Sequence, residues 1–152
     1  MNKTRAGLLV VGTMILGFGS SAGANRIGFG PSLALDQIPL SIQFEYDLSE
    51  HWSLTTGLGL LTLVNGGATY FWQDSQSGPY TSARAGVGVA LPVFSVYVHQ
   101  GYRFALSEFS ALDLEAGAGW VGFSRDSRPY IGTNDFESGV LPSLALRLNI
   151  KF

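Results

Sequence analysis

The chain contains no cysteine, and it is poor in charge, since Lys, Arg, Asp and Glu make up only 13% of its 152 residues. Without cysteine, an exported protein of this size has no disulfide bonds to stabilise it. No run of basic residues offers a nucleic acid an electrostatic surface to bind. Because the sequence also has no metal-ligand cluster, phosphate-binding loop or Cys nucleophile, we expect no metal, no cofactor and no nucleic-acid partner.

Long apolar runs are scarce as well, and the longest lies near the start. Lys3 and Arg5 form a positive segment, residues 6–18 are apolar, and Ala22-Gly23-Ala24 offers a small-residue cleavage site. The apolar run is shorter than the ~20 residues of a membrane-spanning helix, and it contains glycines. We predict a cleaved signal peptide over residues 1–24 and export through the Sec pathway. The alternative is a retained membrane anchor.

Residues 25–152, which remain after that cleavage, suit a single domain. Loss of the two basic residues of the leader leaves seven Lys and Arg against eleven Asp and Glu. Apolar residues are abundant here, yet no uninterrupted run reaches the length of a spanning helix. This argues against a helical membrane protein and fits a β-barrel, in which only every second residue faces lipid.

Alternation of apolar with small or polar residues divides this part of the chain into eight segments. It is cleanest in residues 40–48 and 144–152. Asn65-Gly66-Gly67 is the strongest hairpin signal, because both glycines accept positive φ. Further turns are expected at residues 36–39, 49–51, 74–79, 105–110 and 124–137 and at Pro92. The expected strands span about residues 27–35, 40–48, 52–63, 68–73, 82–91, 94–104, 112–123 and 140–152.

The two faces of these segments differ in chemistry. One is bulky and apolar throughout, and the other carries Gly, Ala, Ser and most of the charges. A soluble sandwich could also alternate, but the small, charged face would be an odd exterior for a soluble barrel. It suits the narrow interior of an eight-stranded barrel, where charges of both signs form ion pairs. The charged residues predicted to form this lumenal network are Glu45, Asp47, Arg84, Arg103, Asp113, Glu115, Arg147 and Lys151.

In these features the chain resembles the small eight-stranded outer-membrane β-barrels of Gram-negative bacteria. The specific part of the resemblance is the leader ending Ala22-Gly23-Ala24 and the terminal strand closing on Phe152, which is similar to the assembly signal of that class. The resemblance implies an all-β, antiparallel up-and-down transmembrane β-barrel over residues 25–152, with a polar, small-residue lumen. It also implies the outer membrane as location, with outer-membrane lipids, periplasmic chaperones and the barrel-assembly machinery as partners.

The same resemblance implies an orientation, and we expect a monomer. Its periplasmic turns would lie near residues 49–51, 74–79 and 105–110, and its outer loops near residues 36–39, 65–67, 92 and 124–137.

Three functions remain open for such a barrel. The first is a non-enzymatic structural or loop-mediated interaction role with a largely plugged lumen, which leads by default. The second is a narrow pore or conduit for small solutes. The third is a lipid-modifying enzyme, a hydrolase or acyltransferase using His99, with Ser95 as nucleophile and Glu115 orienting the base. Lumen packing is the simpler role for His99, and we assign no catalytic residue.

Overall fold

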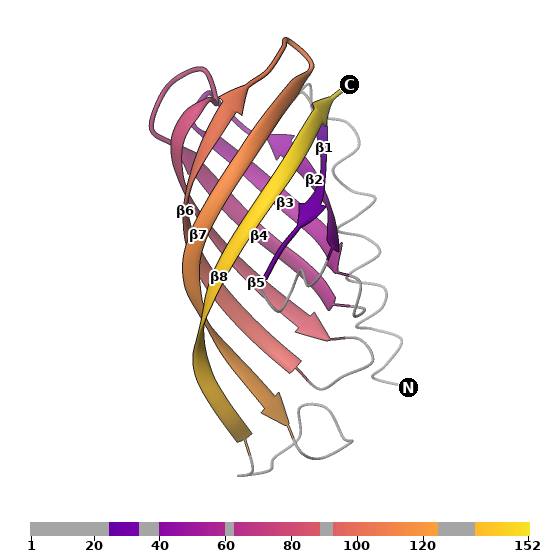
Figure 1. The fold of residues 1–152 in the computed structure, drawn as a ribbon, viewed down its shortest axis with the longest axis vertical. Coiled ribbons are helices and arrows are strands. Elements are labelled where there is room, and N and C mark those ends of the chain that lie inside the picture. Colours follow the sequence, from indigo (N-terminus) through magenta and orange to yellow (C-terminus); the bar gives the residue numbers. More distant parts are fainter. Residues whose placement is uncertain (1–24, 34–39, 60–62, 89–92, 125–135) are drawn as a thin grey trace.

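Eight antiparallel strands close into one barrel, in which each strand pairs with the next along the chain and the last pairs with the first (Figure 1). The computed structural model describes residues 25–33, 40–59, 63–88, 93–124 and 136–152. The strands are β1 (Asn25–Pro31), β2 (Leu40–Asp47), β3 (Trp52–Gly59), β4 (Leu63–Phe71), β5 (Gly78–Gly88), β6 (Val93–Ala105), β7 (Ser110–Ser124) and β8 (Phe136–Lys151). The predicted all-β, eight-stranded antiparallel fold is confirmed. Within the described ranges, no helix has the length and apolar character needed to cross a membrane.

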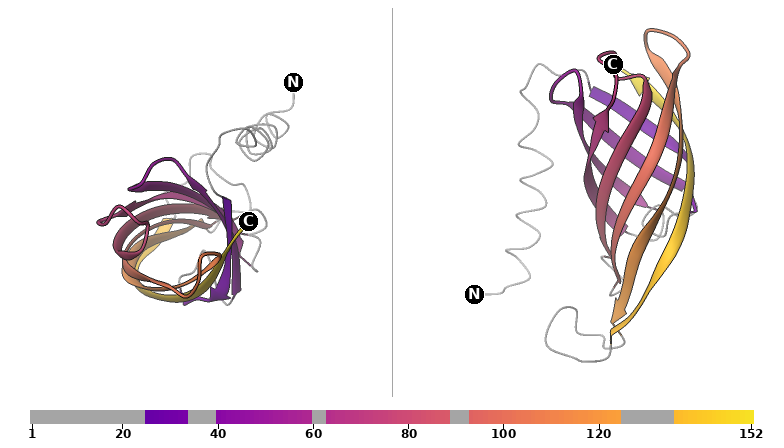
Figure 2. Two further views of the ribbon diagram at one scale, coloured as in Figure 1. Left: turned by 90° about the horizontal axis from the view of Figure 1, so that it is seen from above. Right: turned by 90° about the vertical axis from the view of Figure 1, so that its left-hand side faces the viewer.

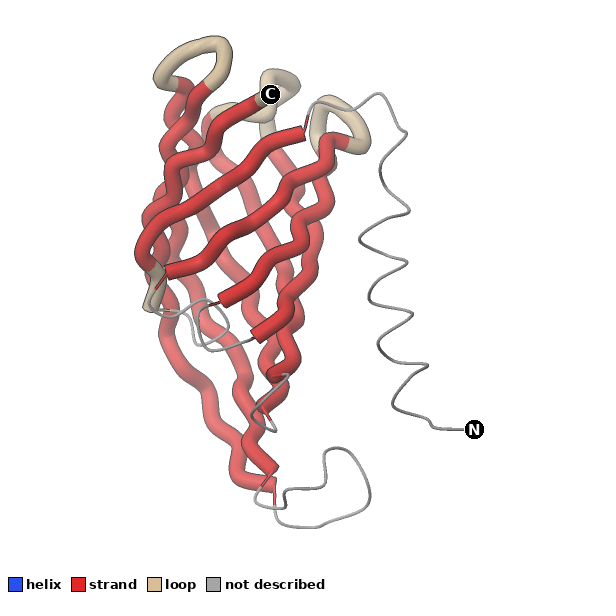
Figure 3. Tube along the Cα trace, turned by 90° about the vertical axis from the view of Figure 1, so that its right-hand side faces the viewer, coloured by secondary structure: helices blue, strands red, loops and turns tan. Residues whose placement is uncertain are grey.

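The barrel has one end with short turns and one uneven end. In the view down the barrel axis, the strands form a ring (Figure 2, left). The short turns lie together at the end where the C-terminus lies (Figure 3). We call this the turn end; it holds the β2–β3, β4–β5 and β6–β7 connections. At the opposite, far end, β7 and β8 extend beyond β1–β4 as a paired ribbon (Figure 1), and β6 pairs with β7 as far as Val93↔Phe123. These two strands have 15 and 16 residues, against seven to nine in β1–β4.

Serine side chains help to close the short turns at the turn end. The Ser49 hydroxyl accepts hydrogen bonds from the backbone N–H groups of Trp52 and His51, at 3.1 and 3.3 Å. In the β6–β7 turn, Ser107 accepts one from Phe109 N–H at 3.2 Å. Such hydroxyls satisfy backbone donors that the ladder leaves unpaired, which favours a tight reversal over a longer loop.

Large apolar side chains point out of the barrel, and polar and charged ones point into it. On β2, Ile42 and Phe44 are 47% and 40% exposed, whereas the alternate residues Gln43 and Glu45 are buried. The same alternation continues along β6, where successive side chains change face. The polar, small-residue lumen predicted from the sequence is therefore confirmed.

Among the described residues, the β1–β8 seam is much shorter than the β7–β8 ladder. β1 pairs with β8 from Arg26↔Lys151 to Phe29↔Leu148, followed by an isolated bridge. Leu33 N–H donates to Leu144 C=O at 2.8 Å, so the backbone of Leu144 faces β1. Because alternate residues face the same way, Pro142 also faces β1, and it has no N–H to donate. The seam contacts that the structure describes end at Leu33 and Leu144, before Pro142.

The predicted hairpin at Asn65-Gly66-Gly67 is wrong, and with it the outer loop expected there. These residues lie inside β4, which begins at Leu63 rather than near residue 68. Gly78 is the only glycine with positive φ among the described residues, so neither Gly66 nor Gly67 serves a turn. A Cβ on Gly67 would collide with the Ala83 carbonyl and the Arg84 side chain. The glycine is needed for this close approach to β5, not for a reversal.

Other strand boundaries also differ from the predictions. β5 starts at Gly78, so Pro79 belongs to a strand rather than to a loop over residues 74–79. β7 and β8 reach Ser124 and Phe136, which shortens the loop predicted over residues 124–137. Strand 52–63 was predicted too long, since β3 ends at Gly59 and Leu63 already belongs to β4. The predicted leader over residues 1–24, the turn at residues 36–39 and the turn at Pro92 lie outside the described residues.

Candidate functional site: the filled lumen

Arg103 of β6 is the centre of one charged cluster near the turn end. Its Nε and Nη2 donate to the two carboxylate oxygens of Asp113 on β7, both at 2.7 Å. Its Nη1 and Nη2 donate to Glu45 on β2 at 2.8 and 2.7 Å. Arg103 and Asp113 are direct cross-strand partners, whereas Glu45 reaches across from another wall. One guanidinium therefore satisfies two buried carboxylates in bidentate geometry, the strongest form of this contact.

Glu115 of β7 is the centre of a second cluster, deeper in the barrel, and it is fully buried. Arg84 of β5 donates to its two oxygens at 2.9 and 2.5 Å, and the Tyr80 hydroxyl donates to one of them at 2.8 Å. Arg147 of β8 pairs with the same carboxylate and also donates to Gln43. Arg147 lies 4.0 Å from the Asp113 carboxylate as well, which joins the two clusters into one network.

Arg26 and Gln76 extend this network to the turn end. Arg26 Nη1 donates to Glu45 at 2.9 Å, to Asp47 at 2.7 Å and to the Gln76 side-chain carbonyl at 2.7 Å. Gln76 belongs to the β4–β5 turn, but its side chain is buried and its amide donates to Ser49 C=O at 2.6 Å. Its φ is +48°. The turn thus folds the Gln76 side chain over the mouth of the barrel.

The structure brings seven of the eight predicted network residues together in ion pairs: Glu45, Asp47, Arg84, Arg103, Asp113, Glu115 and Arg147. The eighth, Lys151, makes no ion pair within the described part of the chain and instead lines a cavity at the turn end. Phe152 is 72% exposed at the same end.

Sequence reasoning missed four network residues: Arg26, Gln43, Tyr80 and Gln76. The alternation pattern did indicate that Arg26 and Tyr80 point inward, because each lies an even number of residues from the inward residues of its strand. The predicted strands began one or two residues too late to include them. Gln43 was placed on the inward face but was not recognised as a partner of Arg147. No sequence pattern indicated that Gln76 points inward, since the direction of its side chain depends on the conformation of the turn.

Aromatic rings fill the space between the charges. The rings of Phe71 and Tyr80 lie 5.3 Å apart, and the Arg103 guanidinium carbon lies 4.7 Å from the Phe71 ring centre. Facing glycines make room for such rings: a Cβ on Gly101 would collide with the Tyr80 ring. Gly119 stands in the same relation to the Tyr97 ring. Large and small inward residues are therefore matched, as close packing of a narrow lumen requires.

His99 is buried in the lumen and stacks on Tyr97, with ring centres 5.6 Å apart. Its cross-strand partners are Ser82 and Gly117. Ser95 lies four residues along the same strand, which separates the two Cα atoms by about 13 Å. The structure therefore does not bring Ser95 and His99 within hydrogen-bonding distance. Neither ring nitrogen of His99 has a hydrogen-bond partner in the described ranges.

The described residues hold no group of three His, Cys, Asp or Glu side chains that could bind a metal ion. A scan against protein-family models finds no family that matches the chain, and a search of curated proteins finds no matching relative.

Proposed function

We propose that this chain is an integral outer-membrane β-barrel with a largely plugged lumen and a non-enzymatic role, either structural or in interactions through its far end. The observation that carries the proposal is the lumenal network. Four arginines and four carboxylates from β1, β2, β5, β6, β7 and β8 meet across the interior, and aromatic rings pack between them. We expect an eight-stranded barrel that is filled in this way to leave no continuous aqueous path wide enough for small solutes.

The outward surface supports a membrane environment. Leu, Ile, Val and Phe side chains are exposed around the barrel, and such an expanse of exposed apolar surface would be costly in water. Trp52, Tyr70 and Trp72 lie near the turn end and point outward, and the rings of Trp52 and Tyr70 are 5.0 Å apart. Aromatic residues at this position match an interfacial girdle.

Recognition by the barrel-assembly machinery belongs to the same proposal. Phe152 follows directly on β8, and its side chain is exposed. An exposed aromatic side chain just after β8 is accessible to a docking partner at the turn end before the barrel closes.

The ribbon at the far end supports an interaction role. β7 and β8 pair there from Trp120↔Val140 to Ser124↔Phe136, and β6 lies beside β7 as far as Val93↔Phe123. Val140 and Leu141 on this ribbon are exposed. A paired ribbon that extends past β1–β4 presents a defined surface to a partner outside the membrane, and this surface does not depend on an open lumen.

Single-channel recording of the refolded barrel in a planar bilayer tests the proposal. The expected result is small or absent conductance in the parent protein. Arg147→Leu should raise ion leakage, because it removes a guanidinium that crosses the lumen between Glu115 and Gln43. Leu146→Ala, one residue earlier and pointing outward, is the matched control and should leave conductance unchanged.

One outcome would replace this proposal. A large, steady conductance in the parent protein, together with normal unfolding of Arg147→Leu, would favour the narrow pore or conduit for small solutes.

A further inference from the structure

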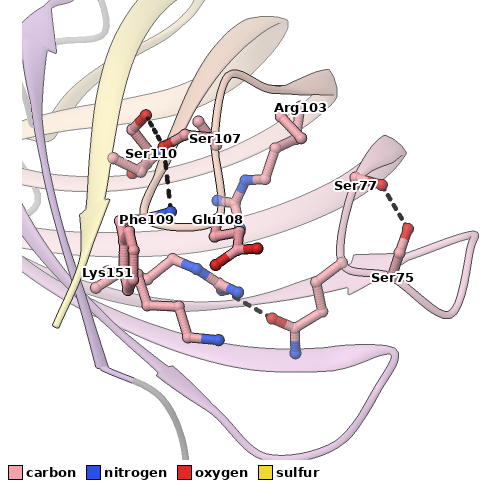
Figure 4. A pocket seen from close by; sticks show the side chains of 13 residues that line it. Ser75, Ser77, Arg103, Ser107, Glu108, Phe109, Ser110 and Lys151 are labelled. Carbon is pink, nitrogen blue, oxygen red and sulfur yellow. Dashed lines mark hydrogen bonds between the residues drawn. The ribbon is translucent and has the colours of Figure 1, made fainter.

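A polar cavity of about 160 Å³ opens at the turn end, between the β4–β5 and β6–β7 turns (Figure 4). Its wall includes three cationic side chains, Arg26, Arg103 and Lys151, and one carboxylate, that of Glu108. Glu108 is exposed on the β6–β7 turn. Arg26 and Arg103 are already paired with Glu45, Asp47 and Asp113. Lys151 is therefore the cation of the wall that makes no ion pair in the described ranges, and Glu108 is a negative group on the solvent side.

The charge balance of the lumen leaves Lys151 as a surplus cation. Every inward carboxylate contacts at least one arginine. Arg26 pairs with Glu45 and Asp47, Arg103 pairs with Glu45 and Asp113, and both Arg84 and Arg147 pair with Glu115. With Lys151, five inward cations face four carboxylates in the described part of the barrel. Lys151 lies at the cavity, where the exposed Glu108 is the one carboxylate of the wall.

Several side-chain N–H and O–H groups around the cavity also have no hydrogen-bond acceptor in the described ranges. Asn149 lines it and is 4% exposed, and its side-chain N–H₂ group has no partner in the described ranges. Lys151 adds three ammonium donors. Two serine pairs, Ser75 with Ser77 and Ser107 with Ser110, are each joined by one hydrogen bond, so each pair keeps one hydroxyl hydrogen for a further acceptor.

We propose that this cavity binds a small oxyanion of the phosphate type, either free in solution or as the head group of a lipid. Such a ligand supplies the missing negative charge, and its several oxygens can accept from donors that approach from different walls. Lys151 is the central ligand, the serine hydroxyls of the two turns complete the shell, and the Asn149 amide, which is closed off from solvent, lies behind the cavity wall. Glu108 opposes binding by charge repulsion.

Calorimetric titration of inorganic phosphate into the barrel, refolded in a phosphate-free nonionic detergent at low salt, tests this site. Lys151→Gln should weaken binding about tenfold or more, because it removes a charge-assisted hydrogen bond. Glu108→Gln should strengthen binding about threefold by removing a nearby like charge. Glu50→Gln removes the same charge at the same end, from the β2–β3 turn outside the cavity, and should change nothing.

A second arm separates the two sources of phosphate. Phosphatidic acid is added to the micelles, with diacylglycerol as control, and binding is followed by the chemical shift of the Asn149 side-chain amide. Binding of inorganic phosphate with the expected effects of the variants assigns the site to a soluble anion. A response to phosphatidic acid alone, again lost in Lys151→Gln, assigns it to a head group.

Absence of binding in both arms, or equal affinity in Lys151→Gln, would overturn the inference. Glu108→Gln keeps the test valid if Lys151→Gln folds poorly, because Glu108 lies on an exposed turn. Failure of this site would leave the conductance result, and therefore the plugged-barrel proposal, unaffected.

Discussion

The inner and outer surfaces of the barrel are built from the same strands but are held by different forces. Along β8, Leu144 and Leu146 are 49% and 42% exposed on the outside, whereas Ala145 and Arg147 are 2% and 3% exposed on the inside. The outside has no partner within the barrel, and the proposed function places its large apolar side chains against lipid. The inside is held by ion pairs and fitted rings, so its stability depends on each partner being present. The difference shows which substitutions should be severe on each face.

The largest effect is expected where one cation holds two buried carboxylates. Arg103→Leu would leave Asp113 and Glu45 each without a bidentate partner, and breaking a buried pair in this way costs about 3–5 kcal/mol. The measurement is the free energy of unfolding in urea with the barrel in lipid vesicles. Phe104→Ala, the neighbouring outward residue, is the control and should cost much less. A small loss in Arg103→Leu would mean that water, not the network, fills the lumen.

The next effect tests the outer surface. Leu146→Arg places a charge where the proposal puts lipid, at a cost of about 2–4 kcal/mol near the middle of the membrane. Ala145→Ser, one residue earlier and inside, adds a hydroxyl beside Glu115 and should cost about 1 kcal/mol or less. Both variants are compared by urea unfolding in vesicles. Equal or reversed losses would show that the outer surface does not face lipid.

The smallest effect separates two adjacent glycines of β4. A Cβ at Gly67, on the inside, would collide with β5 backbone and with Arg84, so Gly67→Ala should lose about 1–3 kcal/mol. A Cβ at Gly66, on the outside, would meet only Thr55 O at 3.7 Å. Gly66→Ala should therefore be neutral or stabilise by up to about 1 kcal/mol. Thermal unfolding of both variants checks this, and equal destabilisation would contradict the difference between the surfaces.

Much of this fold could be predicted from the chain, because side chains alternate in a strand wherever one surface must be polar and the other apolar. That rule placed Glu45, Arg84 and Arg147 inside and Leu146 outside. It could not say which carboxylate meets which arginine, since the contact between Arg103 and Glu45 depends on barrel closure and strand register. The alternation of neighbouring residues carries no information about contacts between strands that are far apart in the sequence.

The errors have a common physical origin. Asn65-Gly66-Gly67 has the composition of a hairpin, but glycine serves equally where backbones and side chains approach closely. The composition alone does not distinguish the two uses. The side chain of Gln76 is inward because the turn folds over the mouth, and a turn has no alternation from which its direction could be predicted. The cavity beside Lys151 is likewise assembled from two turns that are distant in sequence.

The short seam between β1 and β8 has a consequence for the order of folding. β7 and β8 are neighbours in the chain and share a long ladder, so their hairpin can form early and locally. The seam joins opposite ends of the described chain, and few paired residues are described on it. Because distant contacts are formed only after a large loss of chain entropy, we expect ring closure to be the last and slowest step of folding. Until the ring closes, β1 and β8 are both unpaired edge strands. Another polypeptide strand could pair with either edge, so the incomplete barrel is most prone to aggregation at the positions that later form the seam.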